Sequence, residues 1–150
     1  MHRVVISNTS CLIVLSNTGR LDLLHDVYGS VLITNEVAAE FGDPLPEWIN
    51  IISVSDPDKT KLISTNLGVG ESSTIALALE TKNALMILDD KKARRVAKDL
   101  NLVYTGTLGV VIKGTQMGLV PDVQSVIDDF NQCGFWMPPD IEQYLLADNN

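Results

Sequence analysis

The chain has 150 residues, of which 45% are hydrophobic, and a formal net charge of −8 at pH 7. This size and composition exclude an intrinsically disordered chain and predict a single domain over residues 1–150 with one sizeable core. The negative charge argues against a protein that coats nucleic acid nonspecifically through a broad basic surface.

The lengths of the hydrophobic runs and the positions of the cysteines indicate the cellular location of the protein. No run approaches the length of a membrane-spanning helix, and the N-terminus lacks an apolar stretch followed by a cleavage site. Cys11 and Cys133 lie too far apart for a zinc pattern or a disulfide framework, so we expect both to be buried hydrophobes. Together these observations predict a cytoplasmic protein with no membrane association.

In the first half of the chain, short apolar segments alternate with helical patterns. Gly19 and Gly29 mark helix ends, Thr34 can cap the helix that follows it, and Asp56 with Pro57 opens another. The predicted strands cover 3–7, 30–34 and 48–54, and the predicted helices cover 11–19, 20–29, 35–41 and 57–65.

The second half continues this alternation. Glu71 begins a helix with Ile75, Ala76 and Leu79 on its apolar face, and the helix over 90–100 turns residues such as Leu100 inward. Strands are predicted at 84–88 and 102–104, with further helices at 107–118, 121–130 and 139–146. The pattern predicts an α/β fold, a doubly wound, mainly parallel sheet with helices on both faces in three α/β/α layers. In such sheets the ligand crevice lies beyond the carboxyl ends of the strands.

The segment "LGVGESSTIALAL" (67–79) resembles a phosphate-binding loop followed by a helix. Such a loop carries a lysine where this chain has Glu71, and a glycine where it has Thr65. It also follows a strand, whereas 57–65 is predicted as a helix. The phosphate-loop interpretation therefore fails, and Glu71 is either a partner of the helix dipole or part of an acidic site.

Polar and acidic side chains cluster in the sequence directly after the predicted strands. Each one alone is explained by a turn, a cap or the helix dipole. Together they predict an oxygen-rich edge of the sheet, and clustered carboxylates without His or Cys favour Mg²⁺ or Mn²⁺ over zinc. The predicted metal ligands are Asn8, Glu36, Glu71 and Asp90, and the candidate catalytic residues are these four with Asp89 and Thr107.

A basic helix begins immediately after the acid pair Asp89–Asp90. Its outer side is predicted to carry Lys91, Arg94, Arg95 and Lys98. A solvated surface face is the common explanation of such a pattern. Beside an acidic metal site, however, the same residues suit a phosphodiester chain, because cations hold phosphates while the metal activates water.

Five blocks of this sequence resemble PIN-domain nucleases, in particular a short bacterial and archaeal branch of that family. The resemblance covers nearly the whole chain. The blocks are "VVISNTS" (4–10), "GRLDLLHDVYGSVLITNEVAAEF" (19–41), "GVGESSTIALAL" (68–79), "LDDKKARRVAKDLNLVYTGTLGVV" (88–111) and "GLVPDVQSVIDDF" (118–130).

The resemblance implies a Mg²⁺- or Mn²⁺-dependent ribonuclease, often the toxin paired with an antitoxin protein and commonly a homodimer. It places the four family acids at position 8, Glu36, Glu71 and Asp90, with Asp89 beside the last and Thr107 as an accompanying hydroxyl. The resemblance would also explain why Glu71 occupies the position of the lysine in a phosphate-binding loop: the loop would bind a metal cation and not a phosphate.

Position 8 departs from the family pattern, because active PIN nucleases usually have Asp where this chain has Asn8. An amide oxygen still binds Mg²⁺, but without the negative charge. One alternative is therefore a non-catalytic RNA- or protein-binding module on the same fold. A phosphohydrolase or a receiver-like phosphoacceptor is a further alternative, which Asn8 disfavours because such proteins need Asp after the first strand.

Overall fold

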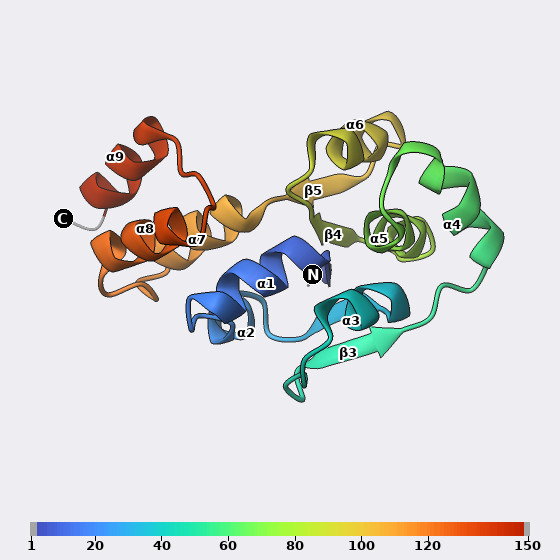
Figure 1. Cartoon of the computed structure of the whole chain (residues 1–150), viewed down its shortest axis with the longest axis horizontal. Helices are drawn as coiled ribbons and strands as arrows, with labels where there is room; N and C mark the ends of the chain where they lie inside the picture. Colours follow the sequence, from blue (N-terminus) through green and yellow to red (C-terminus); the bar gives the residue numbers. More distant parts are fainter. Residues whose placement is uncertain (1–2, 149–150) are drawn as a thin grey trace.

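The computed structural model describes residues 3–148 as a parallel sheet with helices on both faces (Figure 1). The sheet has five strands in the order β3-β2-β1-β4-β5, and every neighbouring pair is parallel. This confirms the predicted three-layer α/β fold. The strands are β1 (Val4–Ser7), β2 (Val31–Thr34), β3 (Ile49–Ile52), β4 (Ala84–Ile87) and β5 (Val103–Thr105).

The helices fall close to the predicted ranges. The predicted helix over 57–65 divides into α4 and a short 3-10 segment, η1. Within residues 3–148, no helix has the length and apolar character needed to span a membrane. The helices are α1 (Thr9–Asn17), α2 (Asp22–Tyr28), α3 (Asn35–Phe41), α4 (Pro57–Ile63), α5 (Val69–Leu79), α6 (Lys91–Asp99), α7 (Thr107–Gln116), α8 (Val123–Gln132) and α9 (Pro139–Asp148), with η1 at Ser64–Asn66.

Alternating side chains of the strands form two separate cores. In β1, Val5 joins the core made with α1, α2, α7, α8 and α9, whereas Ile6 joins the core made with α5 and α6. In β4 the same alternation sends Met86 to the second core and Ile87 to the first. Successive side chains of a strand point to opposite faces, so these short strands read as continuous apolar runs.

Three predicted burial assignments are wrong. Leu79 is 41% exposed and Leu100 is 39% exposed, because they lie at the last residue of α5 and the C-cap of α6, where the helices leave the sheet. Cys133, the C-cap of α8, is exposed, whereas Cys11 is buried as expected. Helix α5 has no single apolar face. It is buried almost all round, because it lies on the sheet and also contacts α3, α4 and α6.

The chain reverses its winding direction between β1 and β4. Strands β2 and β3 extend the sheet on one side of β1, and β4 and β5 extend it on the other. The backbone N–H of Asn8 donates to the carbonyl of Ile87 at 3.1 Å, so the ends of β1 and β4 are adjacent. A ligand crevice is expected at this point of a doubly wound sheet.

Candidate functional site

Glu71, in the first turn of α5, lies beside two other carboxylates. Its Oε1 accepts a hydrogen bond from the N–H of Gly68 at 3.0 Å. Burial is the largest influence on the pKa of Glu71 and raises it; the Gly68 hydrogen bond opposes this, and the charges of Asp90 and Glu40 raise the pKa further. The net pKa lies above its usual value, so the fold holds these acids together although they repel one another.

Glu40 is a site residue that the sequence did not predict. Its Oε1 accepts a hydrogen bond from the hydroxyl of Thr9 at 2.5 Å. Its carboxylate also lies against Gly70, where a Cβ would collide with it. Glu40 was missed because it lies one helical turn inside α3 instead of directly after a strand. Its i,i+4 spacing from Glu36 was the one available signal.

Glu36 occupies a different position. It lines a cavity of about 400 Å³ together with Ser53, Pro57 and Lys61. Glu36 is not among the groups whose charge shifts the pKa of Glu71. Its Oε2 is buried, with no hydrogen-bond partner among the residues that the structure describes. Of the two α3 acids, Glu40 is therefore the one placed with Glu71 and Asp90.

Asn8 brings a buried amide to the end of β1. The residue is 3% exposed and is the N-cap of α1. Its Oδ1 is buried and has no hydrogen-bond partner within residues 3–148. A buried acceptor that stays unsatisfied costs about 1–3 kcal/mol. An oxygen of this kind suits a ligand that supplies positive charge.

Asp89 and Asp90 differ in what they contact. Both oxygens of Asp89 are bound by Thr107, through its N–H at 2.8 Å and its hydroxyl at 2.6 Å. Asp90 caps α6 by accepting from the N–H of Ala93 at 2.9 Å, and its charge acts on Glu71. Asp90 therefore faces the acidic cluster, and Asp89 fixes the start of α7.

The donor chemistry of this edge fits a hard divalent cation. It combines the unpaired Asn8 oxygen with the carboxylates of Glu40, Glu71 and Asp90 and has no His or Cys. Each of these carboxylates has one oxygen engaged in a hydrogen bond, which leaves the other oxygen free to bind a cation. Among the residues that the structure describes, no three His, Cys, Asp or Glu side chains stand close enough to form a metal-binding group.

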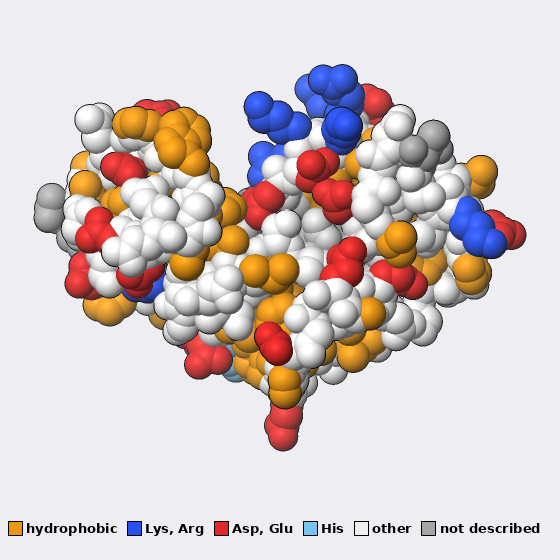
Figure 2. Space-filling model, in the orientation of Figure 1, with side chains coloured by type: hydrophobic (Ala, Val, Ile, Leu, Met, Phe, Trp, Pro, Cys, Tyr) orange, Lys and Arg blue, Asp and Glu red, His pale blue; other side chains and the backbone are white. Residues whose placement is uncertain are grey.

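The basic residues of α6 do not form one outward ridge. Arg94 is half-buried: its Nε donates to the carbonyl of Leu88 at 2.6 Å, and its guanidinium lies 5.3 Å from the centre of the Tyr104 ring. Arg95 lines a cavity between α6 and α4, and Lys91 and Lys98 are exposed. Figure 2 shows basic side chains gathered over α6 with acidic side chains beside them. The predicted outward orientation therefore fails for Arg94.

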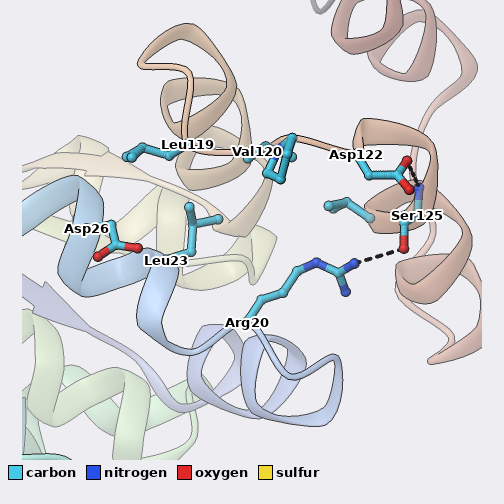
Figure 3. A pocket seen from close by; sticks show the side chains of 9 residues that line it. Arg20, Leu23, Asp26, Leu119, Val120, Asp122 and Ser125 are labelled. Atoms are coloured by element: carbon cyan, nitrogen blue, oxygen red, sulfur yellow. Dashed lines mark hydrogen bonds between the residues drawn. The ribbon is translucent and has the colours of Figure 1, made fainter.

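A cavity of about 230 Å³ lies away from this edge, and none of the candidate acids lines it. Arg20 reaches across it toward α8, as Figure 3 shows, and donates to the hydroxyl of Ser125 at 3.2 Å. The same guanidinium forms an ion pair with Asp129 at 2.7 Å. These contacts join the segment before α2 to α8, which is a structural role.

Comparison with protein families gives one finding on the chain as a whole. A family model described as a PIN domain, DUF3368, matches residues 4–149. Neither the curated proteins nor the solved structures gave a match. The match spans every element described above, including β1, α3, α5 and β4 with their acidic residues.

Proposed function

This chain belongs to the PIN-domain family, and from that premise we propose that it is a divalent-metal-dependent ribonuclease that hydrolyses RNA phosphodiester bonds. The family carries a nuclease-type fold, which is the coarse basis for the proposal. The observation that supports it most directly is the position of Glu71, whose pKa is raised by burial and by the charges of Asp90 and Glu40, at the edge of the sheet where β1 ends in Asn8. Carboxylates that repel one another are stabilised by a cation.

Four side chains are proposed to hold Mg²⁺ or Mn²⁺: Asn8, Glu40, Glu71 and Asp90. A bound cation of this type polarises a phosphodiester and activates water. Glu40 replaces Glu36, the residue predicted from the sequence, because Glu40 lies against Gly70 and its charge raises the pKa of Glu71. Gly70 permits this approach, since any side chain there would displace the carboxylate of Glu40.

The remaining candidate residues are assigned supporting roles. The carboxylate of Asp89 accepts hydrogen bonds from the backbone N–H and the hydroxyl of Thr107, and Thr107 is fully buried. We assign this pair to positioning the ends of β4 and β5 next to each other. Lys91, Arg95 and Lys98 would contact phosphates along the RNA, and Arg94 would present a fixed charge.

The finer biological role rests on the family resemblance. We propose that the protein acts as the toxin of a toxin–antitoxin pair, is neutralised by an antitoxin protein, and forms a homodimer. Co-purification of a neighbouring gene product that abolishes RNA cleavage would support the first two statements, and sedimentation analysis would test the third.

Substituting each acid separately tests the proposed site. We expect Glu40→Gln and Glu71→Gln to lower the rate of RNA cleavage in Mn²⁺ by about 100-fold or more, because each removes a charged ligand. Glu36→Gln and the exposed control Glu47→Gln should stay close to wild type. Loss of activity in Glu36→Gln with full activity in Glu40→Gln would restore the assignment made from the sequence.

A non-catalytic RNA-binding module is the second candidate, and Asn8 is the observation that favours it. If Asn8 is a neutral ligand of an active enzyme, Asn8→Asp adds a charge facing the cation and should raise cleavage. If the folded Asn8→Asp variant and the wild type both bind RNA but neither cuts it in Mn²⁺ or Mg²⁺, the binding-module function replaces the ribonuclease.

A further inference from the structure

A groove of about 590 Å³ lies beside Asp89, in the segment between β4 and α6. Asp89 lines its edge, and Lys91, Arg94 and Tyr104 form one wall. The opposite wall is the segment 135–138 between α8 and α9. Figure 2 shows the molecule hollowed between the basic side chains over α6 and the part that contains α7, α8 and α9.

Trp136 stands on that opposite wall and is 71% exposed. The residues on either side of Trp136 in the chain are packed against the rest of the protein. The Phe135 ring packs edge-on against Phe130 at 5.5 Å between ring centres, and Met137 is 2% exposed. The indole is therefore held outward by a segment anchored on both sides, which makes a large aromatic surface available at little cost in conformational entropy.

The wall across the groove carries fixed positive charge. The guanidinium of Arg94 is held by the carbonyl of Leu88 and by the Tyr104 ring. Lys91, at the start of α6, is exposed beside it. The groove thus places an open aromatic ring opposite two cations, a combination that suits a chain with planar bases and negative phosphates.

Two glycines also line the groove, and neighbouring side chains lie directly against their backbone. A Cβ on Gly106 would collide with Arg94 and Asp89, and a Cβ on Gly109 would collide with the hydroxyl of Thr105. Side chains at these positions would displace the groups that shape the groove.

We propose that this groove binds single-stranded RNA, with an unpaired base stacked on Trp136 and an adjacent phosphate held by Lys91 and Arg94. The inference rests on the proposed ribonuclease function and adds to it a base-stacking position on Trp136. A base in a duplex is stacked between its neighbours, so it cannot lie on a protein side chain. The groove borders Asp89, and Asp90 follows it in the acidic cluster, so a strand held here leads toward the candidate metal ligands.

The tryptophans of this chain allow a direct test of stacking. There are two, and Trp48 is stacked on His25 at 5.2 Å, outside the groove. The Trp48→Phe variant therefore reports from Trp136 alone, and Trp136→Phe reports from Trp48 alone. Each is titrated with a short single-stranded RNA and with a blunt-ended RNA duplex of the same length, with Ca²⁺ as the only divalent ion, and the RNA length is checked afterwards on a gel.

We expect the single strand, and not the duplex, to quench the fluorescence of Trp48→Phe, and neither RNA to quench the fluorescence of Trp136→Phe. Anisotropy of labelled RNA should show that Trp136→Ala weakens single-strand binding about ten-fold, since stacking on an aromatic ring contributes that much per base. Trp136→Tyr should recover most of the affinity. Tyr144→Ala, which removes another exposed aromatic residue on α9, should bind as wild type does.

Three outcomes overturn the inference. If RNA binds and is cut but Trp136 is neither quenched nor needed for affinity, the groove is not the base site, while the proposed ribonuclease stands. If the emission of Trp136 instead shifts with protein concentration alone, a second copy of this chain covers the groove. If no RNA is bound or cut by any variant, the proposed function and this inference both fail.

Discussion

Helix α5 carries a glutamate at each end, and the pKa values of the two are shifted in opposite directions. Glu71, in the first turn, has a raised pKa, and Glu80, the C-cap, has a lowered pKa. The helix dipole alone would produce the reverse, because it favours negative charge at the N-terminal end and disfavours it at the C-terminal end.

Tertiary neighbours explain the reversal. Glu80 accepts hydrogen bonds from the N–H groups of Ser55 at 2.9 Å and Asp56 at 3.0 Å, and Lys59 lies 3.9 Å away. Glu71 is partly buried and faces Asp90 and Glu40. The Glu80 carboxylate therefore stabilises the fold, whereas the Glu71 carboxylate lowers its stability. Such local conflicts concentrate at functional sites.

The largest expected difference between the two ends is their response to metal. A cation that binds only the folded protein at a hundred-fold excess over Kd stabilises it by about 2.7 kcal/mol. For a chain of this length the melting temperature should rise by roughly 5–10 °C in Mn²⁺ or Mg²⁺. Glu71→Gln should lose most of this rise, because it removes a charged ligand, and Glu80→Gln should retain it.

Differential scanning fluorimetry with and without the cation measures this response, with monovalent salt at matched ionic strength as the control. If the cation raises the melting temperatures of Glu71→Gln and wild type equally, Glu71 is only a cap of α5 that accepts a hydrogen bond from Gly68.

An intermediate effect is expected at the other end, without metal. Glu80→Gln should lower the free energy of unfolding by about 1 kcal/mol, because a neutral amide accepts only one of the two N–H hydrogen bonds well. The loss is no larger because both hydrogen bonds are exposed to solvent. Urea unfolding checks the value, with Glu47→Gln as the matched control, and equal stability of the two variants would contradict the structural account.

The pH dependence of that difference has a defined sign. The pKa of Glu80 is lowered, so its contribution is present above the unfolded value of 4.5 and is lost as the pH falls through the folded value. The difference in the free energy of unfolding between wild type and Glu80→Gln should therefore become smaller at acid pH.

The smallest expected effect is on apo stability at Glu71. Glu71→Gln should raise the free energy of unfolding by a few tenths of a kcal/mol, about 0.5 at most after allowance for solvent exposure. The pKa of Glu71 is raised, so the folded state holds its proton more tightly and wild-type stability falls as the pH rises from 4.5 through the folded value. Unfolding curves from pH 4 to 8 should thus show a gain in the variant at pH 7 that vanishes near pH 4. A variant less stable at pH 7 would contradict the repulsion.

Local patterns in the sequence determined the elements and their order. Apolar runs predicted the strands, and caps predicted the helix starts. The hydroxyl of Thr34 accepts from the N–H of Val37, and Asp56 accepts from the N–H of Asp58, as expected from their positions. These contacts involve residues two or three apart, so the chain itself fixes them. The order of the blocks was also enough to indicate the PIN-domain family, and the family model confirms it.

The tertiary structure decided which acids meet. Thr9 and Glu40 are 31 residues apart in the chain, and their contact depends on how α3 is rotated against α1 and α5. That rotation turns Glu40 toward Gly70 and leaves Glu36 in another cavity. The division of labour between Asp89 and Asp90, and the binding of Glu80 to the loop before α4, likewise depend on packing between separate elements. A sequence pattern with a period of two or 3.6 residues specifies which face of an element is buried, but not which side chain of another element it meets.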